Sequence, residues 1–551
     1  MGLEFLIPKP LGRMKPSAWW QSAVIYQIYL RSFQDANGDG IGDLQGVIQR
    51  IDYLEWLGID VVWITPFFPS PMADFGYDVS NFEDVDPTFG SLADLDQLIT
   101  LLHQRNIKII IDFVAAHTSD QHPWFIASKS SRSNPKRNWY FWKDPLPDGR
   151  PPNNWIGRFD GLSAWEWDPE TEQYYLHSFL KEQPDLNWRD PGCEEAMLNV
   201  IDFWLQRGVD GFRVDAAYRA YKDPQFRDNP VNEEWQPGME PSDRLHEVHN
   251  KNVPDIHDFN RMLRKFVDAR GDHLLIAELY KPLELIVKHY GCNDEFHLPL
   301  NSDLMSSDLL WQANQIRKIV ERYEALLPPQ AWPNWSLGNH DKHRVATRLG
   351  VAQAKVGMML LLTLRGTPTI YYGEELGMED AWIPYEHIQD PWEIHAPGIC
   401  VGRDPERSPM LWNREMHAGF CSNSVNPWLP ITMEHSKNNV EAQQNEPRSF
   451  LSLTRSLLAL RKRHSSLQTG EYLSLYAPGN LFCFRRYSGD EDLVVALNLD
   501  AHERDWMLPK EYRHRSTVLL STAMDRQGGR LGEYLQLRGN EGVILRLLDP
   551  P

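Results

Sequence analysis

Cysteines are few in this sequence, and their arrangement excludes the sites that cysteines usually build. The five are odd in number, widely spaced and without a C-x-x-C pair: Cys193, Cys292, Cys400, Cys421 and Cys483. They indicate neither a disulfide framework nor a zinc site. Long apolar segments are missing too: no run of about eighteen apolar residues occurs, and Met1 to Trp20 lacks the continuous hydrophobic stretch of a signal peptide. We therefore predict a cytoplasmic protein without a membrane partner.

Basic residues are outnumbered. The 56 Lys and Arg face 76 Asp and Glu, which gives a net charge of −20. Nucleic acids and anionic membranes bind through basic patches, so this balance argues against both as partners. The 21 tryptophans offer flat aromatic faces that suit sugar rings, although most are expected in the core. The 551 residues predict one large domain with accessory domains.

Short β-branched or aromatic runs alternate with amphipathic helical patterns from about Ser22 to Arg365. Eight parallel strands joined by helices predict an α/β fold, the (β/α)₈ TIM barrel. The candidate strands are Val24–Tyr29, Asp60–Thr65, Lys108–Phe113, Gly211–Asp215, His273–Ala277, Glu295–Pro299, Trp332–Leu337 and Thr367–Tyr371.

Two segments depart from this alternation. Residues 118–187 are rich in Pro, Trp, Asn and Gly, and they predict an inserted subdomain after the third strand. Residues 467–551 contain short alternating strands instead, at Leu481–Tyr487, Asp492–Asn498, Thr517–Leu520 and Gly542–Leu547, which predict a C-terminal antiparallel β domain. The barrel then comprises residues 1–117 and 188–466.

The segment Gly211–Ala216 reads as a buried strand that ends in a carboxylate. Arg213 and Asp215 lie two residues apart and therefore point to the same face, so the cation favours the ionised acid. An isolated R-x-D is more often a structural ion pair. Here, however, acids and histidines follow several barrel strands, where the active sites of such barrels lie. The residues at these strand ends are Tyr77, Asp78, Asp112, His117, Asp215, Glu278, Asn339, His340 and Asp341.

Several ordered motifs carry a specific resemblance. They are DFVAAH at 112–117, GFRVDA at 211–216, AEL at 277–279 and NHD at 339–341, with GIDVVWITP at 58–66 and GTPTIYYGEE at 366–375. With these motifs the sequence resembles the α-amylase clan, glycoside hydrolase family 13. Residues 183–187, QPDLN, are similar to the signature of its oligo-1,6-glucosidase subgroup.

The resemblance implies a role for each matching position. Asp215 would be the nucleophile, Glu278 the general acid and base, and Asp341 the transition-state stabiliser. His117, His340, Arg213 and Tyr77 would bind the glucosyl unit and orient the acids. Asp78 and Arg403 would close the pocket around the non-reducing end, with Arg407 as the alternative to Arg403. The chemistry agrees, because a retaining glycosidase needs one ionised and one protonated carboxyl.

A metal site is also implied. In Asp35–Asp43 the oxygen donors Asp35, Asn37, Asp39, Ile41 and Asp43 alternate along the loop like the first part of an EF-hand, but Gly46 replaces the bidentate glutamate. The resembling α-glucosidases bind one Ca²⁺ or Mg²⁺ in this loop, in a structural role. The alternative is an ordinary loop of Asx turns. Ala116 stands where calcium-dependent amylases carry an asparagine ligand, so their inter-domain calcium site is not expected.

Three functions compete. The resemblance favours a retaining exo-acting α-glucosidase, which releases glucose from short oligosaccharides and also transfers it, with α-1,4 bonds preferred because the small Ala216 follows the nucleophile. A transglycosylase or isomerase on the same scaffold is the alternative, and residues 223–230 resemble a subgroup with marked glucosyl transfer. A non-catalytic transporter subunit of the same fold would show a membrane segment and altered acids, and the sequence has neither. We expect a monomer or a small homo-oligomer.

Overall fold

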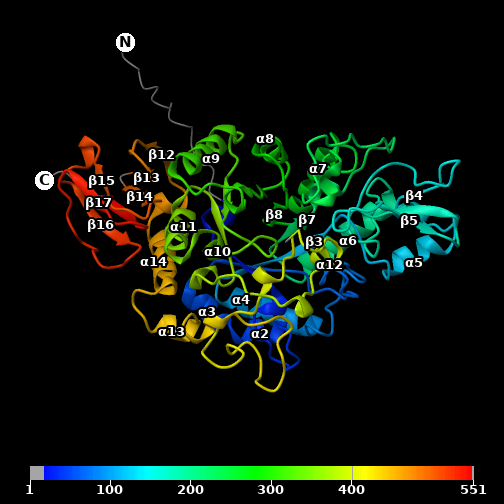
Figure 1. Cartoon of the computed structure of the whole chain (residues 1–551), viewed down its shortest axis with the longest axis horizontal. Helices are drawn as coiled ribbons and strands as arrows, with labels where there is room; N and C mark the ends of the chain where they lie inside the picture. Colours follow the sequence, from blue (N-terminus) through cyan, green and yellow to red (C-terminus); the bar gives the residue numbers. More distant parts are fainter. Residues whose placement is uncertain (1–17, 400, 490, 549–551) are drawn as a thin grey trace, which may run out of the picture.

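Eight parallel strands form a nearly closed barrel, as the sequence predicted (Figure 1). This computed structural model describes residues 18–399, 401–489 and 491–548, so Cys400 and the first seventeen residues lie outside the described part. The strands are β1 (Ile25–Ile28), β2 (Val61–Ile64), β3 (Lys108–Val114), β7 (Gly211–Asp215), β8 (Leu274–Ala277), β9 (Leu298–Pro299), β10 (Asn334–Ser336) and β11 (Thr367–Tyr371). They are almost wholly buried, because helices cover the outer face and side chains fill the inside.

The barrel closes between β9 and β10 through a side chain rather than a ladder. The sheet order runs β10-β11-β1-β2-β3-β7-β8-β9, so these two strands are its ends. At the seam, the Asn334 amide donates to the carbonyl of Pro299 at 2.5 Å, and its oxygen accepts the Asn301 N–H at 3.0 Å. One asparagine thus satisfies backbone groups that a strand partner would otherwise satisfy.

Several of the helices begin at residues whose side chains accept the free N–H groups of the first turn. Ser91 and Asp94 form a capping box at the start of α4, and Asp190 accepts the N–H groups of Gly192 and Cys193 at the start of α6. The longer helices around the barrel are α2 (Leu44–Gln49), α3 (Ile51–Leu57), α4 (Leu92–Gln104), α6 (Pro191–Gln206), α7 (Ile256–Asp268), α9 (Ala313–Leu326), α11 (Val351–Thr363) and α14 (Phe450–Arg463). None of the helices in the described ranges is long and apolar enough to cross a membrane.

The segment between β3 and α6 contains a small sheet of its own. Helix α5 (Pro123–Ser130) precedes β4 (Trp142–Lys143), β5 (Trp165–Asp168) and β6 (Gln173–Leu176), which pair antiparallel in the order β4-β6-β5. Phe141, Trp155, Ala164, Trp165 and Leu176 form its separate core. Figure 1 shows this segment in cyan at one end of the molecule, with the C-terminal strands in red at the other.

The C-terminal domain is antiparallel, as predicted, but it has three more strands than the sequence indicated. The main sheet contains β12 (Glu471–Leu475), β13 (Leu481–Ser488), β14 (Glu491–Asn498), β18 (Gly542–Leu547) and β16 (Ser516–Ser521) in that order. A separate ribbon pairs β15 (Arg504–Met507) with β17 (Tyr534–Leu537). The unpredicted strands β12, β15 and β17 are short and partly exposed, so they lack the apolar run that identified the others.

Two buried arginines join this domain to the barrel. Arg461 on α14 donates to the carbonyls of Leu362 and Gly366 in the barrel and of Leu467 at the start of the β domain. Arg486 on β13 donates to the carbonyls of Thr363 at the end of α11 and of Gly470. Both side chains are fully buried. The arginines therefore satisfy carbonyls at the C-terminal end of α11, which have no partner within the helix.

Candidate active site

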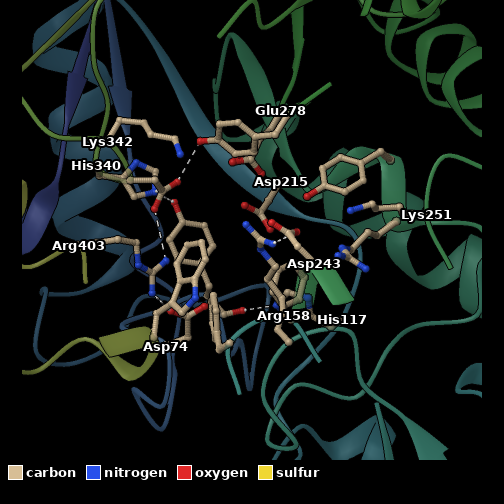
Figure 2. Close-up of a pocket in the computed structure, with 18 residues that line it drawn as sticks. Asp74, His117, Arg158, Asp215, Asp243, Lys251, Glu278, His340, Lys342 and Arg403 are labelled. Atoms are coloured by element: carbon tan, nitrogen blue, oxygen red, sulfur yellow. Dashed lines mark hydrogen bonds and ion pairs between the residues drawn. The ribbon is translucent and has the colours of Figure 1, made fainter. Parts of the chain in front are cut away.

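The predicted acids meet in one pocket at the C-terminal ends of the barrel strands (Figure 2). Asp215 ends β7, Glu278 follows β8 directly, and Asp341 lies in the turn after β10. The pocket holds about 280 Å³, close to the lower end of the ~300–1,000 Å³ typical of small-molecule sites. Such a volume suits a small sugar better than a polymer.

Arg213 bridges the two acids that the chemistry requires. Its Nη1 lies 2.7 Å from Asp215 Oδ1 and its Nη2 lies 2.7 Å from Glu278 Oε1. Asp112 accepts a further bond from Nη1 at 2.6 Å and another from the Trp63 indole at 3.1 Å, so the guanidinium is fixed from behind. A single guanidinium spans the two carboxylates. The two carboxylates are therefore held close together, as the double displacement of a retaining glycosidase requires.

The protonation of the pair differs from the simple expectation. Burial, and next the negative charge of Glu278, raise the pKa of Asp215 well above its ordinary value, although Arg213 acts to lower it. Arg213 therefore does not fully offset burial and the second carboxylate at Asp215.

The backbone after the nucleophile helps to place Glu278. Ala216 adopts a left-handed conformation with φ 42°, and its N–H donates to Glu278 Oε2 at 2.9 Å. The turn points this N–H across to β8 rather than along its own strand. Glu278 is thus held by Arg213 through one oxygen and by the backbone through the other.

Asp341 lies among cations. Arg407 Nη2 is 3.0 Å from Asp341 Oδ1 and Arg403 Nη1 is 3.4 Å from it, while the Tyr280 hydroxyl lies 3.3 Å from Oδ2. Burial acts to raise the pKa of Asp341, but the neighbouring cationic groups, Arg403 and Arg407 among them, outweigh it and hold that pKa below the ordinary value. Asp341 is therefore ionised at neutral pH. Arg407, which the sequence offered only as an alternative to Arg403, binds this acid together with it.

His340 is held by two hydrogen bonds and a stacked ring. Gln27 Nε2 lies 2.7 Å from Nδ1, Tyr77 Oη lies 2.8 Å from Nε2, and the Tyr77 ring stacks on the imidazole at 5.6 Å. Burial lowers the pKa of His340 to about 3, so the ring is neutral. Gln27 and Tyr77 thus hold the imidazole through both of its nitrogens.

His117 also lines the pocket as a neutral ring. Its Nε2 lies 3.1 Å from the Tyr77 carbonyl and 3.0 Å from Gln183 Nε2. Burial lowers the pKa of His117 to about 4. Gln183 belongs to the QPDLN segment, so the inserted segment contributes directly to the position of this histidine.

The closed end of the pocket is built by Asp74, not by Asp78. Asp74 Oδ1 accepts a bond from Arg403 Nη2 at 2.9 Å, and Arg403 also binds Asp390 at 2.6 Å. The Asp78 carboxylate instead accepts the N–H groups of Ala73 and Asp74, at 2.8 and 2.9 Å, and does not line the pocket. Its two oxygens are occupied by the turn that presents Asp74. The acid that pairs with Arg403 is therefore Asp74, four residues before the expected Asp78.

The comparisons with known proteins agree with this geometry. The profile of the alpha-amylase catalytic domain matches residues 27–470. The chain belongs to the α-amylase family. One relative is the probable alpha-glucosidase of Rhizobium meliloti (strain 1021). It is 42% identical to this chain over 506 residues, and the alignment covers 89% of this chain and 91% of the relative. The oligo-1,6-glucosidase of Parageobacillus thermoglucosidasius is 34% identical, with 97% and 99% covered.

Solved structures show the same fold for this α-amylase family member. An alpha-glucosyl transfer enzyme, XgtA, superposes with a TM-score of 0.89 at 39% identity, covering 96% of this chain and 100% of its own. The isomaltulose synthase SmuA from Protaminobacter rubrum gives 0.87 at 31% identity, covering 98% and 100%. The family resemblance seen in the motifs and the barrel predicted from the strands are both confirmed.

Some residues of the site were not identified from the sequence, because they belong to none of the family motifs. Gln27 is the third of the four residues of β1 and the only polar one, so a polar side chain in a buried strand was the signal that could have found it. Asp74 and Asp390 lie in loops, where nothing in the sequence marks their convergence on Arg403. Tyr280, two residues after Glu278, donates to Asp341 and accepts from Asn339 at 3.0 Å. Only the folded loops bring these side chains together.

The loop Asp35–Asp43 folds tightly around its own backbone. Asp35 accepts the N–H groups of Gly38 and Gly40, at 2.6 and 2.9 Å, and Asp43 accepts those of Ala36 and Asn37, at 3.0 and 3.1 Å. Gly40 has φ +88°, and a side chain there would meet the carbonyl of Asn426. The all-oxygen donor set suits Ca²⁺ or Mg²⁺. Among the described residues, however, the two His/Cys/Asp/Glu groups with ligand atoms within 4.8 Å of one another lie elsewhere.

Proposed function

We propose that this protein is a retaining exo-acting α-glucosidase that releases terminal glucose from short α-glucosides and prefers α-1,4 bonds. The observation that carries the proposal is the single guanidinium of Arg213 between Asp215 and Glu278, in a pocket whose inner end is closed by the Arg403–Asp74 pair. A closed end admits only the terminal sugar of a chain. The relatives named alpha-glucosidase and oligo-1,6-glucosidase support this activity.

In the first half of the reaction, Asp215 attacks the anomeric carbon of the terminal glucose while Glu278 gives its proton to the leaving oxygen. The bond to the leaving sugar breaks as the ester bond to Asp215 forms. Positive charge develops on the glucosyl ring at this point. The ionised Asp341, held by Arg403 and Arg407, strengthens its hydrogen bonds to a ring hydroxyl as that charge grows.

In the second half, Glu278 takes a proton from the attacking hydroxyl, and the ester to Asp215 is cleaved with net retention. Water as the attacking molecule gives glucose, and a sugar hydroxyl gives a transfer product. We propose that both occur, because an alpha-glucosyl transfer enzyme shares 39% identity with this chain over nearly its whole length. The similarity to the isomaltulose synthase SmuA favours an isomerising transferase as the second candidate.

The experiment uses maltose and an activated aryl α-glucoside. Asp215→Asn should abolish turnover of both, because an amide cannot form the ester. Glu278→Gln should cripple maltose cleavage but spare the aryl substrate, whose leaving group needs little protonation. Asp243→Asn is the matched control, since Asp243 lines the same pocket without touching Arg213. An Asp215→Asn enzyme that keeps more than about a hundredth of the wild-type activity would contradict the assignment.

Product analysis on maltose over time separates the two candidates. Glucose as the main early product supports the α-glucosidase, with trisaccharides marking transfer. An isomeric disaccharide as the main product would support the isomerising transferase instead. The structural Ca²⁺ or Mg²⁺ in Asp35–Asp43 and the cytoplasmic location stay part of the proposal. The location is supported by the four cysteines of the described ranges, all of which are free.

A further inference from the structure

Three side chains from separate segments converge beside the active site. His343 lies two residues after Asp341, Asp380 follows the short helix η7 (Glu374–Leu376), and Glu406 lies in η9 (Pro405–Arg407). Their ligand atoms all lie within 4.8 Å of one another. His343 Nδ1 is 2.8 Å from Asp380 Oδ2 and 3.8 Å from Glu406 Oε2.

The Glu406 carboxylate is buried without a full set of partners. Its side chain is 2% exposed, and Oε2 has no hydrogen-bond partner among the described residues although it faces His343. Such an oxygen loses its hydration without compensation, which is costly. The Asp380 carboxylate nearby adds repulsion between two acids. A positive charge between them would remove both costs.

Two hydrogen bonds fix Asp380 from one side, and the cluster is open to solvent on the other. Asp380 Oδ1 accepts the Arg344 N–H at 2.8 Å, and the Asp380 N–H donates to Thr347 Oγ1 at 2.7 Å. Oδ2 therefore points to His343, with Glu406 close by. The His343 side chain is 46% exposed, so the cluster has access to solvent and a path by which an ion can enter.

We propose that His343, Asp380 and Glu406 bind a divalent transition-metal ion, with Zn²⁺ as the best fit. An imidazole and two carboxylates are ligands that zinc accepts, and the imidazole selects against Ca²⁺ and Mg²⁺. Ligand atoms about 2.0–2.2 Å from a tetrahedral zinc lie roughly 3.3–3.5 Å from one another. The 2.8 Å contact of His343 must therefore lengthen and the 3.8 Å contact must shorten, each by about half an ångström. Solvent would fill the fourth position.

A simple ion pair between His343 and Asp380 is the competing explanation. It accounts for the 2.8 Å contact, but it leaves Glu406 Oε2 buried and unpartnered within the described part of the chain. The metal accounts for all three side chains.

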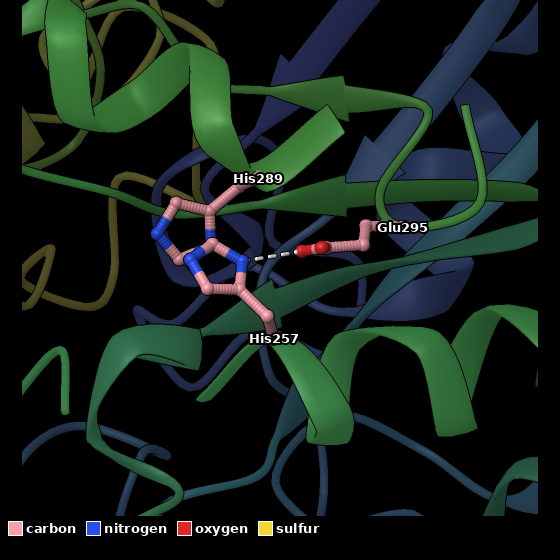
Figure 3. Close-up of side chains that lie close together, drawn as sticks. All are labelled: His257, His289 and Glu295. Carbon is pink, nitrogen blue, oxygen red and sulfur yellow. Dashed lines mark hydrogen bonds and ion pairs between the residues drawn. The ribbon is translucent and has the colours of Figure 1, made fainter. Parts of the chain in front are cut away.

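The second His/Glu group of the described residues provides a contrast (Figure 3). His257 lies 2.8 Å from Glu295, and both nitrogens of His289 are engaged, by Asn260 at 2.9 Å and Asn252 at 3.1 Å. Arg261 and Asn260 occupy the oxygens of Glu295. Among the described residues, that group therefore has no buried carboxylate oxygen without a partner, in contrast to Glu406 Oε2, and it serves as a control.

Binding would connect two segments that carry the catalytic machinery. His343 belongs to the turn of Asp341, and Glu406 precedes Arg407, which holds Asp341 at 3.0 Å. An ion would tie these segments together behind the pocket. We expect it to raise the melting temperature, since only the folded chain brings the three ligands together.

The test is calorimetric titration of ZnCl₂ into the metal-stripped full-length protein, with CaCl₂ present to fill the loop at 35–43. We expect one zinc site in the wild type and a rise in melting temperature with zinc. Glu406→Gln should weaken binding at least tenfold, and His343→Gln should abolish it together with the melting shift. His257→Gln should bind zinc as the wild type does.

Each other outcome overturns the proposal. Zinc that fails to bind the wild type, or that binds His343→Gln and Glu406→Gln unchanged, places no ion at this cluster. Loss of binding in His257→Gln alone would assign the ion to the control group. Because His343 is exposed, its substitution should leave the fold intact, and a circular dichroism spectrum of each variant checks this.

Discussion

The pair Asp74 and Asp78 gives the sharpest test of the pocket. Both lie in the loop after β2, four residues apart, and both are buried. Asp74 contacts Arg403 inside the pocket, whereas Asp78 accepts two backbone N–H groups behind it. Replacing each in turn by asparagine keeps the size of the side chain and removes its charge. The two variants should therefore fail in different ways.

The magnitudes follow from these contacts. In Asp74→Asn, Arg403 keeps Asp390 as its partner, so the fold loses little and the loss falls on the charged contact that Asp74 offers to the sugar. A hydrogen bond to a charged group contributes about 1.5–3 kcal/mol, which is on the order of tenfold to a hundredfold in kcat/KM. In Asp78→Asn, one backbone N–H faces the new NH₂ group. The unpaired donor should cost about 1–3 kcal/mol of stability, with kcat/KM within about threefold of the wild type.

The assay measures kcat/KM on maltose and the melting temperature for both variants. We expect Asp74→Asn to lose activity with little change in melting, and Asp78→Asn to melt several degrees earlier with nearly normal activity. The reasoning is refuted if Asp78→Asn loses a hundredfold in kcat/KM at an unchanged melting temperature, or if Asp74→Asn is as active as the wild type.

Three further perturbations test other parts of the structure. Ala216→Val should raise the ratio of kcat/KM on isomaltose to kcat/KM on maltose about tenfold to a hundredfold. A β-branched residue at φ 42° is strained, but this strain affects both substrates equally and cancels in the ratio. An unchanged ratio would mean that other loops determine the linkage preference. Asp39→Ala should lower the melting temperature in calcium but not in chelator, whereas equal melting throughout would indicate an empty loop. Burial lowers the pKa of His122 to about 3 in the folded chain. Below pH ~6.5 the histidine is protonated in the unfolded chain but stays neutral in the folded chain, so the free energy of unfolding falls as the pH drops. The cost in melting temperature of His122→Asn should therefore be smaller at pH 5 than at pH 7, and an equal cost would show that the imidazole is not held neutral.

The barrel was predictable because its strands are buried on both faces. The run Lys108–Phe113 ends one residue short of β3, and Gly211–Asp215 coincides with β7. Glu295–Pro299 was too long, since β9 contains only Leu298 and Pro299. There the seam side chain Asn334 replaces a ladder, and no periodicity in the sequence reports such a replacement.

The active-site residues also differ in how well the sequence predicted them, according to whether they lie at strand ends or in loops. Residues at strand ends, such as Asp215 and Glu278, could be placed because the barrel brings all strand ends to one face. Residues in long loops could not, since their position depends on hydrogen bonds that the loop makes with itself. The choice between Asp74 and Asp78 was decided by two backbone N–H groups. The effect of burial on Asp215 likewise required the folded pocket.

The arginines that join the C-terminal domain to the barrel restrict how the two can be recombined. A chimaera that takes its β domain from another protein must bring an arginine to the position of Arg486, or the carbonyls of Thr363 and Gly470 lose their donor. A chain cut after α14 would leave Arg461 beside an open surface with the end of α11 half satisfied. Engineering that exchanges whole domains should therefore start from hybrids that keep both arginines. Loops at the pocket mouth can be exchanged without touching this junction.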